Sequence, residues 1–402
     1  MPKTITVHGV VAAGFEPVRD AFLANFVRRG EIGAGFCVYR DGVPIIDLWG
    51  GVADRATDRP WDADTMAIVF SSTKGALALS LMLLADRGLL DYDAPVARYW
   101  PEFAQADKAD ITARTLLNHR AGLITIDQPF TLDDLAHDPQ KVVDACARQA
   151  PMWAPGTDQG YHAVTFGLYG GELFRRVAGT SVGRFLADEI AGPLGADVFI
   201  GLPAHHDHRV AVNYPADTRE RLTRGLPKLL FHRGLEGRVY RQAAQRGTAT
   251  ARAFSNPREL GPMGLDNYNT RRVRAMELPW SNGVASARGL ARVYAALARG
   301  GELDGVRLLR PRSVEAVHRR QSWVSNDRVL RKPLGFAQGF IKEETRMFSP
   351  HVEAFGHPGA GGALGFCDPR SRLGIGYVMN RMGHHVRSPR ALALCHALYR
   401  CL

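Results

Sequence analysis

The stretch SSTKGALALSLMLL occupies residues 71–84, and the fold of the chain depends on it. After the opening tetrad, apolar side chains recur on every side of a helix, so the sequence predicts a helix that is buried on all faces. Lys74 falls in the first turn of this helix, where no exposed face is open to it. Because lysine is almost never fully buried unless it is paired, its presence here indicates a chemical purpose.

The spacing of Ser71 and Lys74 suits nucleophilic chemistry. A cation at the positive end of a helix is unfavourable, and burial disfavours the charged form, so both effects lower the pKa of Lys74. At three residues' spacing the amine lies one turn from the Ser71 hydroxyl and can accept its proton. The helix N-terminus also supplies a backbone N–H and a positive field for an oxyanion. The alternative is an N-capping serine beside an exposed lysine.

Outward from this helix, the chain predicts an α+β fold with an antiparallel sheet flanked by helices. Residues 16–29 have the periodicity of an amphipathic helix, and two apolar runs flanking Asp41-Gly42 indicate a hairpin. Further strands are expected at Leu334–Ile341, Glu353–Phe355, Ala363–Phe366 and Leu373–Asn380. A last helix is expected after Ser388-Pro389. Helical patterns at 163–177, 182–191 and 286–299 complete the prediction.

Because strands lie near both chain ends and helices fill the middle, we expect two structural units. Residues 1–70 and 284–402 would form a discontinuous sheet domain. Residues 71–283 would form a mostly helical domain with an irregular basic insert at about 201–280, and the active site would lie between the two domains.

Composition excludes several classes of protein. The 402 residues are 46% hydrophobic with a formal net charge of +11, and the arginines are dispersed without an aromatic-interleaved stripe, so we expect no nucleic-acid partner. No apolar run approaches the length of a membrane span, and the start lacks a secretory signal, so we expect no stable membrane anchor and a cytoplasmic protein. The five cysteines contain no C-x-x-C, which argues against disulfides and zinc. We expect neither a cofactor nor a metal.

Two further motifs extend the site. The segment WAPGTDQGYHA at residues 153–163 contains Tyr161, and a phenol near a cationic lysine would be pushed toward phenolate. The segment FGHPGAGGALG at residues 355–365 holds five glycines between strand-like runs, as expected where backbone approaches a ligand closely. Pro358 has no N–H, whereas Ala360 can donate one to an oxyanion.

In this order the three motifs resemble the serine β-lactamase and penicillin-binding-protein superfamily, most of all its class C-related branch of family VIII carboxylesterases. The resemblance implies an α/β domain interrupted by a helical domain. It implies that Ser71 is the nucleophile, Lys74 its activating partner and Tyr161 the general base and proton relay. The N–H groups of Ser71 and Ala360 would form the oxyanion hole, and the substrate would be a small-molecule ester.

Two departures from the family pattern bear on the substrate. His357-Pro358-Gly359 stands where β-lactamases usually carry Lys-Thr-Gly, and a histidine supplies a weaker, pH-dependent charge. Ala163 stands where they usually carry asparagine. We expect His357, Gly359 and Ala163 to contact the substrate, and both departures favour small, uncharged esters over β-lactams.

Several alternatives stay open. Residues 179–183 match the G-x-S-x-G nucleophile elbow, but a helix precedes Ser181 where that elbow needs a strand, so Ser181 is expected to be an N-cap. The histidines at 205, 206 and 208 permit a metal site, although a solvated turn is favoured. A β-lactamase, an amidase or an acyl transferase on the same scaffold is the second functional hypothesis, and a non-catalytic scaffold protein is the third.

Overall fold

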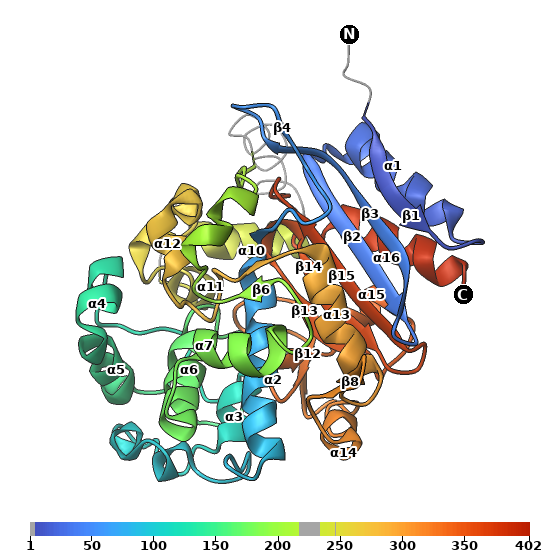
Figure 1. Ribbon diagram of the computed structural model, residues 1–402. Helices are drawn as coiled ribbons and strands as arrows, with labels where there is room; N and C mark the ends of the chain where they lie inside the picture. The colour runs from blue at the N-terminus through green and yellow to red at the C-terminus, as the bar shows by residue number, and fades with distance from the viewer. Residues whose placement is uncertain (1–4, 217–233, 246) are drawn as a thin grey trace.

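The computed structural model of the chain describes residues 5–216, 234–245 and 247–402 (Figure 1). Part of the predicted basic insert, residues 217–233 and 246, lies outside the described residues. The helices run as follows: α1 Glu16–Arg29, α2 Thr73–Asp86, α3 Ala113–Leu117, α4 Leu132–His137, α5 Pro139–Arg148, α6 Thr165–Ala178, α7 Val182–Leu186, α10 Leu235–Ala244, α11 Ala249–Ala253, α12 Arg271–Ala275, α13 Ala287–Ala298, α14 Pro311–Glu315, α15 Glu343–Phe348 and α16 Pro389–Arg400.

One large antiparallel sheet dominates the described residues, in the order β1-β3-β2-β15-β14-β13-β12-β11-β10, with β4 paired to β3. Its strands are β1 Val7–Val11, β2 Gly33–Arg40, β3 Val43–Asp54, β4 Arg59–Pro60, β10 Ser322–Val324, β11 Leu334–Ala337, β12 Phe340–Ile341, β13 Phe355–Pro358, β14 Leu364–Asp368 and β15 Leu373–Met379. The predicted antiparallel sheet flanked by helices is therefore confirmed. Two short sheets among the described residues lie outside it. One has the order β5-β7-β6 and the other pairs β8 with β9: β5 Ala67–Ile68, β6 Val198–Phe199, β7 Val284–Ala285, β8 Glu302–Leu303 and β9 Val306–Arg307.

The two halves of the sheet, which are distant in sequence, meet where β2 pairs with β15 over seven residues, from Leu373 opposite Arg40 to Met379 opposite Ala34. The predicted hairpin turn lies between β2 and β3. Asp41 and Gly42 both have positive φ, at 53° and 84°, as a two-residue turn with the twist of the flanking strands requires.

Helices cover both faces of this sheet (Figure 1). α1 and α16 pack against each other on one face, while α13 packs on β2, β14 and β15 from the other. The approach of α13 is close, because a Cβ added at Gly374 or Gly376 would stand 2.2 Å from the backbone of α13, at the Ala295 nitrogen and the Ala287 oxygen. Glycine at these strand positions thus sets the spacing between helix and sheet.

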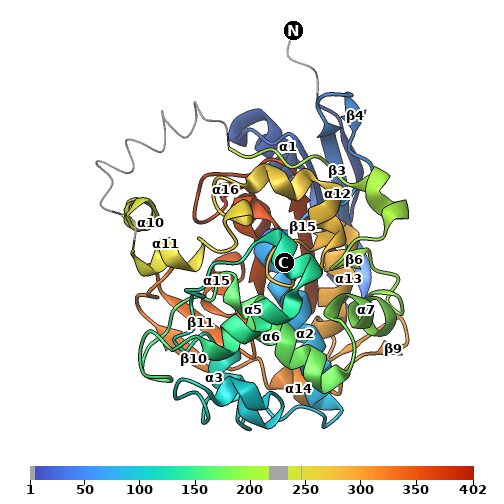
Figure 2. The same ribbon diagram turned by 90° about the vertical axis from the view of Figure 1, so that its left-hand side faces the viewer.

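The helix α2 runs between the sheet and the helices of the middle of the chain, and Figure 2 places α5 and α6 on its side away from the sheet. α2 contacts α6 and α7 as well as β12 and β13. It buries eleven of its fourteen residues, so the prediction of a helix enclosed on all faces is confirmed. Lys74 is 0% exposed in its first turn.

Three predicted elements differ in detail. The strand expected at Leu334–Ile341 is a hairpin, since Gln338 and Gly339 have φ of 49° and 88° and turn the chain between β11 and β12. The strand expected at Glu353–Phe355 begins at Phe355 and continues through the motif to Pro358. The helix expected over 182–191 continues after Leu186 as a π-helical turn at Ala187–Ala191.

Candidate active site

Ser71 lies in a 3₁₀ turn, Phe70–Ser72, that leads directly into α2. Its side chain is partly exposed, whereas Ser72 beside it is buried and donates to the carbonyl of His357 at 2.8 Å. Phe70 has φ of 46°, in the left-handed region that costs a bulky residue roughly 1–3 kcal/mol. Packing of its ring against Tyr268, with centroids 5.0 Å apart, stabilises this conformation. The surrounding core therefore holds the serine on a strained turn.

Lys74 has the neighbours expected of a buried base. Its Nζ donates to the backbone carbonyl of Trp280 at 2.8 Å and to Ser71 Oγ at 3.3 Å, so the predicted one-turn contact exists. Nζ also lies 5.1 Å from the centre of the Tyr161 ring. Burial lowers the pKa of Lys74 well below its ordinary value. The amine can thus be neutral and accept a proton near neutral pH.

The carbonyl of Trp280 is a functional group that the sequence did not reveal. It belongs to a segment that Asn282, 0% exposed, shapes by donating to the carbonyls of Val273 and Met276. Gly283 N then donates to Thr73 Oγ1 at 2.9 Å, which docks the segment on α2. Because every residue has a carbonyl, a backbone acceptor leaves no signature in the residue types. In the sequence, only the Asn282-Gly283 pair ahead of α13 pointed to a special backbone conformation in this segment.

Tyr161 is 3% exposed and lies above the amine of Lys74. Burial raises the pKa of the Tyr161 phenol, and a hydrogen bond with Ser71 opposes this only in part. The prediction that the phenol is pushed toward phenolate is therefore wrong. The physical reason is that burial in apolar surroundings penalises the phenolate, and the nearby Asp327 carboxylate disfavours it further.

Two side chains distant in sequence fix the position of Tyr161. Asp327, 0% exposed, accepts from the Tyr161 N–H at 3.1 Å and from the N–H groups of Val329 and Leu330 at 2.9 Å each. The Nδ1 of His119 accepts from the backbone N–H of His162, the residue after Tyr161, at 2.9 Å. The ring centres of His119 and Tyr161 lie 5.2 Å apart. The residue types gave no reason to single out Asp327. Its role arises only because its loop packs against Tyr161, which is 166 residues away in the sequence.

His357 is 1% exposed, and its ring lies 6.0 Å from that of Tyr161. Its Nδ1 contacts the carbonyl of Pro358 at 2.8 Å, which assigns the proton to that nitrogen. Burial, together with nearby Lys74, lowers the pKa of His357 to about 3. The prediction of a pH-dependent charge is therefore wrong, since the imidazole stays neutral in the physiological range. It faces the Lys74–Tyr161 pair from the end of β13.

The remaining predicted residues are Gly359 and Ala360, which follow β13, and Ala163, which lies near Tyr161. A Cβ at Gly359 would stand 2.2 Å from the carbonyl oxygen of Val69, so only glycine lets the end of β13 approach the serine turn this closely. Ala360 follows and is exposed, with its N–H one residue beyond that contact. Ala163 is 4% exposed in an apolar cluster with Tyr161 and Phe336, and offers no amide to a substrate.

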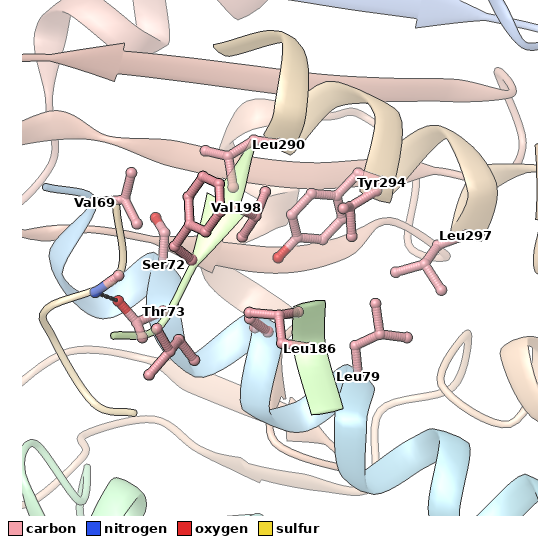
Figure 3. A pocket seen from close by; sticks show the side chains of 15 residues that line it. Val69, Ser72, Thr73, Leu79, Leu186, Val198, Leu290, Tyr294 and Leu297 are labelled. Carbon is pink, nitrogen blue, oxygen red and sulfur yellow. Dashed lines mark hydrogen bonds between the residues drawn. The ribbon is translucent and has the colours of Figure 1, made fainter. Parts of the chain in front are cut away.

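A small apolar cavity of about 20 Å³ lies behind the first turn of α2, on the side of Ser72 and Thr73 (Figure 3). Tyr294 from α13 directs its hydroxyl into this space, and the hydroxyl is buried with no hydrogen-bond partner among the described residues. A Cβ at Gly75 would stand 2.3 Å from that oxygen, and one at Gly365 would stand 2.4 Å from the Tyr294 ring. Two glycines thus make room for one tyrosine beneath the Ser71–Lys74 turn.

The competing sequence motifs lie elsewhere. Ser181 is the N-cap of α7, as predicted, and its Oγ donates to Glu277 at 2.7 Å. His205, His206 and His208 belong to a 3₁₀ turn in which Asp207 pairs with Arg274 at 2.8 Å. Within the part of the chain that the structure describes, no group of three histidine, cysteine or acidic side chains could hold a metal ion. Over the same residues, none of the helices has the length and apolar character to cross a bilayer.

The antiparallel sheet, the enclosed helix and the serine, lysine and tyrosine gathered at the helix start define a protein of the β-lactamase and transpeptidase class of folds. The family model described as Beta-lactamase matches residues 19–397. The chain therefore belongs to the β-lactamase family, and the predicted superfamily is confirmed.

Similar proteins carry several names. The chain is 35% identical over 378 residues to the esterase/beta-lactamase LipL of Mycobacterium tuberculosis, covering 94% of this chain and 83% of LipL. A crystal structure of a family VIII carboxylesterase matches with a TM-score of 0.86 and 39% identity, over 99% of this chain and 100% of that one. A penicillin-binding-protein homologue from Caulobacter crescentus matches with a TM-score of 0.85 and 34% identity, over 99% and 100%.

Replacing Gly75 by alanine is expected to lower the free energy of unfolding by about 1–3 kcal/mol, because the new methyl group meets the Tyr294 hydroxyl. Tyr294→Phe alone should change it by less than about 1 kcal/mol, since the buried oxygen has no partner to lose. In the double variant the phenylalanine should restore at least half of the loss. Urea unfolding of the four proteins measures this, and strict additivity of the two changes would contradict the packing described.

The pH dependence of ester turnover is expected to reflect Lys74 and not His357. Because burial lowers the lysine pKa and the neutral amine is the reactive form, activity should be present above that pKa and lost as pH falls through it. A His357→Gln variant should show the same acid limb as the wild type, with its midpoint shifted by no more than about 0.3 pH unit. An acid limb that disappears in His357→Gln would show that this imidazole titrates.

Proposed function

We propose that the chain is a serine carboxylesterase that cleaves small, uncharged esters through an acyl-enzyme on Ser71. The observation that carries the proposal is the contact of a fully buried lysine amine with a partly exposed serine hydroxyl, at 3.3 Å. The names of two similar proteins, a family VIII carboxylesterase and an esterase/beta-lactamase, support the same reaction.

In acylation, Ser71 Oγ attacks the ester carbonyl and its proton passes to the neutral amine of Lys74. The N–H groups of Ser71 and Ala360 hold the negative oxygen of the tetrahedral intermediate. As the carbon–oxygen bond to the alcohol breaks, Tyr161 gives its proton to the leaving oxygen and regains one from the Lys74 ammonium. The alcohol leaves protonated, and both side chains return to their neutral forms.

In deacylation the relay runs in reverse. A water molecule attacks the acyl carbon and transfers a proton through Tyr161 and Lys74 to Ser71 Oγ as the acid is released. The raised pKa of Tyr161 suits this role, because a protonated phenol can donate first and accept later. No step needs a cofactor.

The preference for uncharged esters follows from what surrounds the serine. A neutral His357 provides no cation for a substrate carboxylate, and Ala163 provides no amide for a β-lactam side chain. We place this site between a sheet unit, residues 1–70 and 284–402, and a helical unit, residues 71–283. We also place the protein in the cytoplasm, since all five cysteines are free.

Short p-nitrophenyl esters test the activity directly. Wild-type protein should turn them over with a burst of one phenolate per site, and Ser71→Ala should lose about 10⁴-fold or more in kcat. Ser181→Ala is the matched control, because that serine caps α7 and donates to Glu277. A fluorophosphonate should label the Ser71 peptide, and a label on the Ser181 peptide would overturn the assignment. If no ester forms an acyl-enzyme, the scaffold hypothesis gains support.

β-Lactam hydrolysis is the second candidate, favoured by the double name of LipL. Because a neutral His357 offers no cation and Ala163 no amide to the β-lactam, we expect kcat/KM for a chromogenic cephalosporin to be at least about 100-fold below that for a short ester. Comparable values for the two substrates would favour this candidate. A small p-nitroanilide assayed alongside tests the amidase alternative.

A further inference from the structure

The proposed oxyanion donor Ala360 belongs to a turn that is rich in glycine. Gly361 and Gly362 have φ of 82° and 137°, and a Cβ at Gly361 would stand 2.9 Å from Met382. Such backbone suits glycine alone, and glycine has the greatest conformational freedom to lose. A donor that must hold its position within a fraction of an ångström therefore needs an anchor from outside the turn.

Arg390 provides that anchor from the start of α16. Its Nη2 donates to the carbonyl of Gly361 at 2.9 Å and to the carbonyl of Arg381 at 2.6 Å. Gly383 N donates to the same Gly361 carbonyl at 2.8 Å. The guanidinium thus binds the residue directly after the oxyanion donor, while its own side chain is only 3% exposed.

A buried carboxylate fixes the guanidinium in turn. Glu31, whose side chain is fully buried, accepts from Arg390 Nη1 at 2.5 Å and from the Tyr377 hydroxyl. Tyr377 lies on β15 and is 0% exposed, and Glu31 follows the end of α1. Segments that are far apart in sequence therefore meet at the planar guanidinium of Arg390. Its several N–H groups can donate to all of these acceptors in one plane, whereas an ammonium cannot.

Stability does not account for this arrangement. Desolvating a carboxylate and a guanidinium costs about as much as their attraction returns, so well-packed apolar residues often serve equally well. What an apolar pair cannot do is hold the Gly361 carbonyl. On this ground, and resting on the function proposed above, we propose that Arg390 is a positioning residue that sets the Ala360 N–H for the oxyanion, with Glu31 and Tyr377 orienting its guanidinium.

The test uses Arg390→Lys, which keeps the charge beside Glu31, and the charge-balanced pair Glu31→Gln with Arg390→Met. We expect kcat/KM for a short ester to fall about 10- to 100-fold in both, less than when an oxyanion donor is removed. KM should stay within about threefold, and affinity for a trifluoromethyl ketone, which forms a tetrahedral adduct, should fall by the same factor as kcat/KM. Arg288→Met is the control, because Arg288 pairs with Asp47 away from the turn.

Active-site titration with a fluorophosphonate counts the folded, competent sites, so all rates are taken per titrated site. Arg390→Lys keeps a positive charge at this position, so it keeps the test decisive if the double variant folds poorly. Unchanged kcat/KM per site in the variants, with an active wild type, overturns the positioning role alone. A wild type that neither hydrolyses esters nor labels on Ser71 overturns the proposed function, and the role of Arg390 with it. An equal loss in Arg288→Met would make the effect a general one and also overturn the proposal.

Discussion

The burial of one amine organises this molecule. Lys74 has no access to solvent, and its hydrogen bonds go to the Trp280 carbonyl and the Ser71 hydroxyl. Desolvation makes the neutral amine of Lys74 accessible. The buried side chain that the fold must accommodate is therefore also the base that the chemistry requires. The protonation states of Tyr161 and His357 follow from the same dry environment, and both groups are neutral as a consequence.

Around that amine, the precise positions come from backbone contacts between segments distant in sequence. The strained Phe70, the close approach of Gly359 to Val69 and the docking of Gly283 on Thr73 each bring a different stretch to the serine turn. The Asp327 carboxylate does the same for Tyr161. The packed core behind the turn thus orients these groups.

The sequence was sufficient for the fold class, the hairpin at Asp41-Gly42 and the enclosed helix, because alternation, turn chemistry and all-round apolarity are local signals. It also placed Ser71 and Lys74 within reach, since helical spacing sets that distance. It failed for the Trp280 carbonyl, Asp327 and Arg390, whose roles exist only through long-range packing. It erred on the charges of Tyr161 and His357, because residue types alone do not report how completely a side chain is dehydrated.

The pairing of β2 with β15 has a consequence for biosynthesis. The middle of the sheet cannot close until Leu373–Met379 has left the ribosome, more than three hundred residues after its partner Gly33–Arg40. Contacts of such sequence separation make folding slow, and the early strands wait with unpaired edges that other chains could join. Ala360 is likewise synthesised late, so a nascent chain that already carries the Ser71 helix still lacks the turn that holds Ala360.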